Sequence, residues 1–189
     1  MLHDLVRINR SYRRFYEAEA ITEETLRGLV DLARLSASGS NRQPLKYALS
    51  HTAERNAVIF PHLAWAGYLA DWDGPEAGER PTAYILVLGD TEISQSFGID
   101  PGIASQSILL GAAELGLGGC IIASVEREAL RSALGVDPRF KILHVIALGK
   151  PKETVVIEPV GEDGDIKYWR DEQDVHHVPK RELDDLIVD

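Results

Sequence analysis

The first residues that could do chemistry lie near the start of the chain, in Asn9-Arg10-Ser11-Tyr12-Arg13-Arg14-Phe15. Each guanidinium offers paired N–H donors to phosphate oxygens, and a serine hydroxyl adds a short neutral donor. The heptapeptide therefore suits a phosphate group. Arginine-rich turns on protein surfaces have the same composition, so the segment taken alone also fits a solvated basic turn.

Two further segments suit a flat heterocyclic ligand. Ser36-Ala37-Ser38-Gly39-Ser40-Asn41-Arg42-Gln43-Pro44 combines small residues, which let backbone amides approach a ligand, with amide side chains that can pair with a ring edge. Leu115-Gly116-Leu117-Gly118-Gly119-Cys120 is a glycine-rich turn before a predicted strand, and such a turn can lie against a ring. The glycine spacing is not the dinucleotide fingerprint, and the chain has no P-loop. Both segments also fit plain connections between elements.

The fourth segment is His176-His177-Val178-Pro179-Lys180-Arg181. Two adjacent histidines near several acids could suggest a metal, but neighbouring residues on an extended segment point in opposite directions, so we expect no metal site. A second anion contact from Lys180 or Arg181 is the more attractive role. The chain has no Gly-x-Ser-x-Gly, His-Glu-x-x-His or Cys-x-x-Cys motif, and no residue is predicted as acid, base or nucleophile. That absence suits an enzyme whose cofactor carries the chemistry.

Composition excludes several classes of protein. The chain fits a single domain, residues 1–189, large enough to bury a core unaided. Its formal net charge of -10 disfavours nucleic-acid binding. No apolar run reaches the ~18 residues of a membrane span, and the N-terminus lacks the apolar stretch of a secretory signal. The single cysteine, Cys120, is expected to be a buried small hydrophobe and fits a reducing compartment.

Spacing and caps predict the elements that position these segments. Thr22 caps a helix with an apolar stripe through Ala33. Asp100-Pro101 caps and opens a second helix, which we expect to be buried on all faces and to end near Gly116. A third helix spans about 125–134 with Ser124 as its cap, and Pro179 opens a short last one. Segments rich in Val, Ile, Leu or Tyr predict strands at 47–50, 83–88, 120–123, 142–148 and 155–157. This mixture favours an α+β domain, a sheet covered by helices.

Two polar segments lie between these elements. Residues 71–81 are rich in turn formers and predict a surface loop. Residues 161–178 are also polar, but they contain Tyr168 and Trp169, which a wholly solvated loop rarely carries. We therefore expect this arm to dock on another surface.

Taken in order, these motifs resemble those of the FMN-dependent nitroreductase-like family. Arg10-Ser11-x-Arg13 resembles the family's Arg-Ser-x-Arg motif, and Ser38-Gly39-Ser40-Asn41-x-Gln43-Pro44 resembles its Ser-x-x-Asn-x-Gln-Pro loop. Residues 102–120 resemble its central helix and the following turn, 146–151 its late strand ending in Gly-x-Pro, and 179–183 its C-terminal ending. The similarity covers nearly the whole chain, and its specificity comes from five motifs in the correct order.

The resemblance implies an α+β sandwich with a central, mostly antiparallel sheet, in an intertwined homodimer whose C-terminal arms wrap the partner. One FMN would lie at each end of the interface of this cytoplasmic enzyme. Hydride would pass from NAD(P)H to FMN and on to a small acceptor such as a nitro compound or quinone. Alternatives in the same fold are a flavin-binding or redox-sensing protein with little turnover, a flavin destructase and a reductive dehalogenase.

Motif matching also implies which residues hold the cofactor. The first motif and a C-terminal cation would hold the FMN phosphate and ribityl chain; these residues are Arg10, Ser11, Arg13 and Lys180, with Arg181 or Arg170 as alternatives to Lys180. In the second loop, Ser38, Gly39 and Ser40 would reach the flavin of the other subunit, and Asn41 and Gln43 would lie near the ring. The backbone amides around Ile122 and Ala123 would approach the redox nitrogen of the ring. The short stretch between Tyr47 and Arg80 implies a small lid over the flavin.

Overall fold

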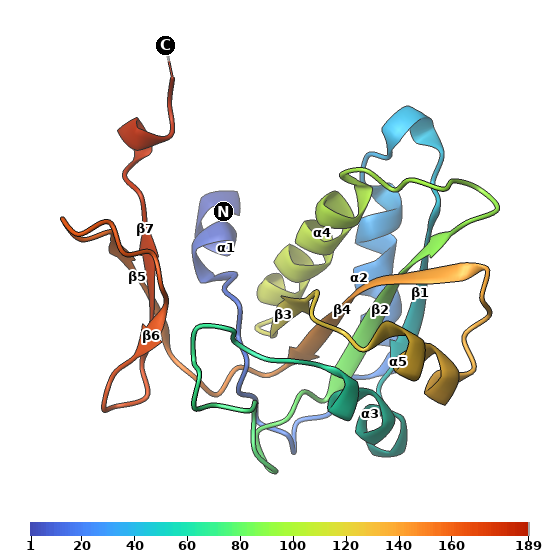
Figure 1. Cartoon of the computed structure of the whole chain (residues 1–189), viewed down its shortest axis with the longest axis horizontal. Helices are drawn as coiled ribbons and strands as arrows, with labels where there is room; N and C mark the ends of the chain where they lie inside the picture. The colour runs from blue at the N-terminus through green and yellow to red at the C-terminus, as the bar shows by residue number, and fades with distance from the viewer. Residues whose placement is uncertain (189) are drawn as a thin grey trace.

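A four-stranded antiparallel sheet with helices on both faces forms the body of the protein in a computed structural model, which describes residues 1–188 (Figure 1). The strand order is β1-β2-β4-β3, and every neighbouring pair is antiparallel. The strands are β1 (Leu45–Ser50), β2 (Ala83–Asp90), β3 (Gly118–Ile122) and β4 (Phe140–Gly149). The predicted α+β sheet sandwich is confirmed. Asp189, the last residue of the predicted domain, lies outside the described residues.

Alternating side chains of the two central strands build a core on each face of the sheet. Ile85 and Ile146 pack with α2 (Glu23–Leu35) and α4 (Asp100–Glu114), whereas Leu86 and Val145 pack with α3 (Ala53–Ile59) and α5 (Arg127–Leu134). All eight residues of β2 are buried. A strand covered on both faces is mostly apolar, which explains why the run from Ala83 to Leu88 of β2 is recognisable in the sequence.

The helix boundaries confirm part of the sequence prediction. Thr22 caps α2, and its Oγ1 accepts the backbone N–H of Thr25 at 3.1 Å. Gly116, with φ of 69°, follows the end of α4 as predicted. The prediction that this helix is buried on all faces is wrong for the single chain, because Gly102 and Gln106 are exposed on the side of α4 that faces away from the sheet core. Gly111 lets α4 approach α2, because an added Cβ would lie 2.3 Å from Leu32 Cδ1. The predictions did not include α1 (Leu2–Ile8) or α3, which are each seven residues long.

Two predicted helix caps are wrong. Asp100 is the first residue of α4, after Ile99, and its carboxylate instead accepts hydrogen bonds from the 38–39 loop. The residue before α5 is Glu126, whereas the Ser124 carbonyl accepts the N–H of Ala64 at 3.0 Å. The Asp100 side chain is thus taken by a segment distant in the sequence, whereas Ser124 lies two residues before the residue that precedes α5.

A small three-stranded sheet forms a lobe beside the body, with α1 between the two in the view of Figure 1. We call residues 153–180 the C-terminal lobe. Its strands are β5 (Val155–Pro159), β6 (Trp169–Arg170) and β7 (His176–Lys180), in the order β5-β7-β6. The pair β5–β7 is parallel and β6–β7 is antiparallel.

The predicted last helix from Pro179 is wrong, because Pro179 belongs to β7 and only a 3-10 turn at Leu183–Asp185 follows. The backbone N–H of His176 donates to the carbonyl of Thr154, on the side of β7 that faces β5. Backbone N–H groups of successive residues in a strand point to opposite sides, so the nitrogen of Pro179 points toward the β6 side. Since β6 pairs only with His176 and His177, the missing N–H of the proline breaks no ladder bond.

The predicted docking of the 161–178 arm is confirmed for Tyr168, which packs against a loop of the same chain. The Tyr168 ring centroid lies 4.9 Å from that of Tyr68, and the Arg170 guanidinium lies 4.3 Å from the Trp72 ring. Residues 71–81 form a loop as predicted, and Trp72 anchors that loop to the lobe. Within residues 1–188 no helix has the length and apolar character needed to cross a membrane.

His177 on β7 contacts β5, β6 and the residue after β6. Nδ1 lies 2.9 Å from Glu158 Oε2 and Nε2 lies 3.2 Å from Asp171 Oδ2, while the ring stacks on Trp169 with centroids 4.1 Å apart. The hydrogen bonds to Asp171 and Glu158 raise the pKa of His177. A raised histidine pKa stabilises the fold below the unfolded value of about 6.5, and this contribution is lost as pH rises through the folded value.

We therefore expect the lobe to open more readily at pH 8 than at pH 6. Amide protection factors of residues 169–177, corrected for intrinsic exchange, should fall over this interval. The His177→Gln variant should show low protection at both pH values, because glutamine carries no titrating charge. Equal protection of the wild-type lobe at pH 6 and pH 8 would refute the role of His177.

Candidate functional site

The arginine-rich segment lines a depression of about 270 Å³ between β3, α4 and the C-terminal lobe. Segments from both ends of the chain meet here, as the sequence predicted. The polar residues that line it and belong to the predicted site are Arg10, Ser11, Arg13 and Lys180. Leu109, Ile121 and Val178 give it an apolar side. We call this depression the anion pocket, because of the charges described next.

Arg13 is the most unusual residue of the anion pocket, since it is 9% exposed and has no carboxylate partner within residues 1–188. Its Nη1 donates to the carbonyl of Ser11 at 3.2 Å and lies 3.3 Å from His176 Nε2. Its guanidinium carbon lies 4.9 Å from the Tyr168 ring centroid. Burying a charge without an opposite charge costs folding free energy, so the surroundings of Arg13 favour binding of an anion.

The neighbouring Arg14 shows the contrasting arrangement. Its guanidinium pairs with Glu79, with Nη2 to Oε1 at 2.9 Å, and with Asp174 at 3.1 Å. Lys152 also contacts Glu79, at 2.8 Å. The hydrogen bond from Arg14 is the main reason that the pKa of Glu79 falls to about 2. The charge of Arg14 is thus already neutralised, which leaves Arg13 as the residue of this pair available to a ligand.

The other two cations of the anion pocket are also free of acids in the described part of the chain. Arg10 donates from Nη2 to the carbonyl of Val6 at 2.7 Å, and its buried Nε has no acceptor. Lys180 lies on β7 and forms no salt bridge with any described residue. Among the three cations that sequence reasoning left open for the C-terminal contact, the structure places Lys180 in the pocket, whereas Arg170 pairs with Glu153 at 3.0 Å.

Glu153 fixes the backbone of the arginine-rich segment, and the sequence analysis did not identify it as a functional residue. Its side chain is 1% exposed. Oε1 accepts the backbone N–H groups of Arg13 and Arg14, the second at 3.2 Å, and Oε2 accepts from Arg170. This carboxylate therefore joins the N-terminal segment to the C-terminal lobe without contacting the Arg13 guanidinium. The charge of Glu153 alone could not distinguish it in the sequence, because the chain carries 30 acidic residues.

The Ser38 loop does not line the anion pocket of its own chain. Ser38 Oγ donates to Asp100 at 2.6 Å, Gly39 donates its N–H to the same carboxylate at 2.9 Å, and the N–H of Gln43 bonds to Ser38 Oγ at 2.9 Å. These bonds hold Ser40, Asn41 and Gln43 at φ near 52°, a left-handed conformation that is uncommon outside glycine. The three side chains are exposed. Their contact with a flavin stays a prediction.

Ile122 and Ala123 lie at the end of β3, the edge strand that also contributes Gly119 and Ile121 to the anion pocket. The Ile122 side chain is buried in the core on the opposite face, and the Ala123 carbonyl accepts from Arg127 Nη2 at 2.8 Å. The role of their amides beside a redox ring also stays a prediction. Cys120, between them and Gly119, is a buried free thiol as expected.

The donors of the anion pocket fit the phosphate end of FMN. Its two arginines, one lysine and one serine hydroxyl match the oxygens of a dianionic monoester. The buried Nε of Arg10 has no acceptor among the described residues, which is the state expected of a donor reserved for a ligand. The apolar side offered by Leu109, Ile121 and Val178 suits the carbon-rich remainder of such a cofactor. Residues 1–188 contain no cluster of His, Cys, Asp and Glu suited to a metal ion.

Known proteins share this fold and sequence pattern. A family model described as Nitroreductase family matches residues 7–150. An Archaeoglobus fulgidus protein named putative NADH dehydrogenase/NAD(P)H nitroreductase is 27% identical over 148 residues, which cover 74% of this chain and 80% of that protein.

Two solved structures resemble the whole chain. A nitroreductase family protein from Streptococcus pneumoniae superposes with a TM-score of 0.74 at 15% identity, covering 100% of both chains. A putative nitroreductase in complex with FMN from Desulfovibrio desulfuricans superposes with a TM-score of 0.72 at 24% identity, covering 100% of this chain and 95% of the other. At these identities the likeness establishes the fold.

Proposed function

Because this chain belongs to the nitroreductase family, we propose that it is an FMN-dependent oxidoreductase that transfers hydride from NAD(P)H to a small acceptor. The observation that carries the proposal is Arg13, a buried guanidinium without a carboxylate, in a pocket with Arg10, Ser11 and Lys180. A phosphate monoester would supply the missing negative charge. The printed names of the relatives, which include NAD(P)H nitroreductase and a complex with FMN, support the choice of cofactor and reductant.

The residues of the anion pocket would bind and orient the cofactor. Arg10, Arg13 and Lys180 would neutralise the phosphate, and the hydroxyl of Ser11 would add a neutral donor. Although the whole chain carries a net charge of -10, these three cations concentrate positive charge at the pocket, which favours binding of an anion there. FMN, when bound, supplies hydride transfer, which agrees with the absence of an acid, base or nucleophile motif.

We also propose that the working unit is a homodimer, as the family resemblance implies. Large apolar side chains stand exposed on α1 and on the tail after β7: Leu2, Val6, Ile8, Leu183, Leu186, Ile187 and Val188. A groove of about 740 Å³ also runs between α2 and β1, with Ala33 and Tyr47 in its lining and Ser38 beside them. A second copy would cover these surfaces, and its Ser38–Gln43 loop would complete the flavin site. We place the dimer in the cytoplasm, where a free Cys120 is stable.

An absorbance spectrum of the purified protein tests the proposal. We expect a yellow protein, or a colourless one that takes up one FMN per chain, which NADH or NADPH bleaches under nitrogen. Sedimentation should give twice the mass of the 20.9 kDa chain. A colourless monomer that is indifferent to added FMN would overturn the proposal. A bound flavin that neither nicotinamide reduces would support the alternative, a flavin-binding protein with little turnover.

A further inference from the structure

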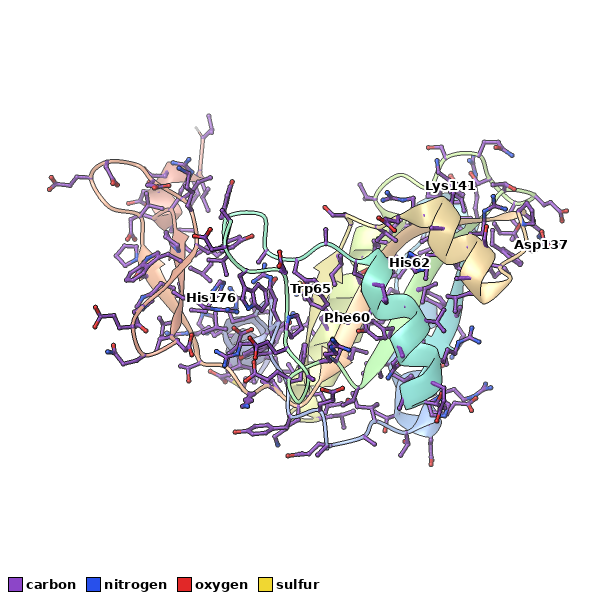
Figure 2. All side chains as sticks on the ribbon, turned by 60° about the horizontal axis from the view of Figure 1, so that its bottom comes forward. Phe60, His62, Trp65, Asp137, Lys141 and His176 are labelled. Atoms are coloured by element: carbon purple, nitrogen blue, oxygen red, sulfur yellow. The ribbon has the colours of Figure 1, made fainter. Side chains whose placement is uncertain are left out.

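His176 is the most deeply buried polar residue of the anion pocket, and no predicted role involves it. It is 1% exposed, and it lies in the C-terminal lobe (Figure 2). Its Nε2 is 3.3 Å from Arg13 Nη1, and its ring centroid is 5.2 Å from that of Tyr168. In the described chain, Nδ1 has no hydrogen-bond partner.

The contact with Arg13 fixes the chemical state of the His176 ring. A guanidinium can only donate, so Nε2 must accept, and the proton of a neutral imidazole then resides on Nδ1. Burial, followed by the positive charges of Arg13 and Arg170, lowers the pKa of His176 to about 4. The ring is therefore a neutral acceptor at pH 7.

Among residues 1–188, the groups that contact the Arg13 guanidinium are uncharged. They are the carbonyl of Ser11, the imidazole of His176 and the face of the Tyr168 ring. A carboxylate at the place of His176 would also orient the guanidinium, but it would neutralise its charge, as Glu79 does for Arg14. A neutral acceptor fixes the direction of the donors and leaves the full positive charge for an anion.

The backbone of the lobe holds His176 in place for this task. Its N–H donates to the carbonyl of Thr154 at 2.9 Å, in the β5–β7 pair, and Tyr168 packs on its ring. A side chain that is already fixed loses less rotamer freedom when a ligand binds, which increases affinity.

We propose that His176 is a positioning residue for Arg13, which as a neutral acceptor aims the guanidinium at the phosphate of the cofactor without neutralising it. The inference rests on the proposed function, because the phosphate is that of FMN. It assigns the C-terminal lobe a part in cofactor affinity that goes beyond the direct contact from Lys180.

A double-mutant cycle between Arg13 and His176 tests the proposal, with dissociation constants measured for FMN and for riboflavin, which lacks the phosphate. His176→Leu should weaken FMN binding about 10-fold, within the range of coupling between contacting residues, and leave riboflavin binding unchanged. His176→Gln should retain most of the FMN affinity, because its side-chain oxygen can accept in place of Nε2. In the Arg13→Ala background, His176→Leu should change FMN affinity less than about 2-fold.

Other results would overturn the proposal. If His176→Leu weakens FMN equally with and without Arg13, or weakens riboflavin as much as FMN, then His176 supports the fold or the ring and does not act through Arg13. If the leucine variant fails to fold, His176→Asn replaces it, since its shorter side chain cannot reach Arg13 and should behave as a loss of the acceptor. Wild-type protein that binds no FMN would refute the proposed function itself, whereas binding without coupling would refute only the role of His176.

Discussion

Replacing Arg10 and Arg13 together by alanine should release FMN from the purified protein while leaving riboflavin binding nearly unchanged. Each charge-assisted contact with a phosphate contributes about 1.5 to 3 kcal/mol, so the loss of both should weaken FMN binding about 10²- to 10⁴-fold. The effect should concentrate on the phosphate because both residues line the polar part of the anion pocket. Fluorescence titration with the two flavins measures it directly.

A control variant of equal charge separates contact from long-range attraction. Arg55 on α3 and Arg131 on α5 line neither the anion pocket nor the groove between α2 and β1, and Arg131 pairs with its helix neighbour Glu128. Their joint replacement by alanine changes the net charge by the same amount as the test variant, yet it should leave FMN affinity within about 2-fold, because exposed charges are screened by salt. Wild-type affinity in the Arg10/Arg13 variant would show that the phosphate is bound elsewhere.

The elements predicted correctly from the sequence are those whose pattern is local. In α2, the Thr22 cap and the apolar stripe lie next to each other in the sequence. In β2, a continuous run of apolar residues indicates that both faces of the strand are buried. The strand position of Pro179 is not predictable from its own segment, because Pro179 pairs with β5 and its nitrogen faces the side of β7 on which β6 has already ended. Asp100 shows the same limit, since Ser38 and Gly39 take the carboxylate that would otherwise cap α4.

The residues of the candidate site also fall into those predictable from a local motif and those whose roles depend on distant segments. Arg10, Ser11, Arg13 and Lys180 could be predicted because each belongs to a motif with phosphate-binding chemistry, and the structure brings all four to one pocket. The residues that orient them, Glu153 and His176, had no motif, since their roles exist only after the lobe packs on the N-terminal segment. The one usable signal was Tyr168 in a polar arm, which indicated docking but not its target.

The largest loss of stability should follow replacement of Glu153 by alanine. This variant would leave the backbone N–H groups of Arg13 and Arg14 without their acceptor. It would also leave Arg170, whose side chain is 12% exposed, without its Glu153 partner. Removing one member of a buried ion pair typically costs about 3 to 5 kcal/mol, a large part of the stability of a domain. Urea denaturation should show this as a lower midpoint with a similar slope.

Glu126 provides the matched control for Glu153. Its side chain is 69% exposed and forms a salt bridge with His62, so Glu126→Ala should cost less than about 1 kcal/mol. Equal midpoints for the two alanine variants would show that Glu153 is not a structural anchor. Because Glu153 holds the backbone of Arg13, its loss should also weaken FMN binding, whereas Arg13→Ala should weaken FMN without a comparable fall in the urea midpoint of the flavin-free protein. This asymmetry is expected because Glu153 builds the anion pocket, while the burial of the Arg13 charge without a partner opposes folding until an anion binds.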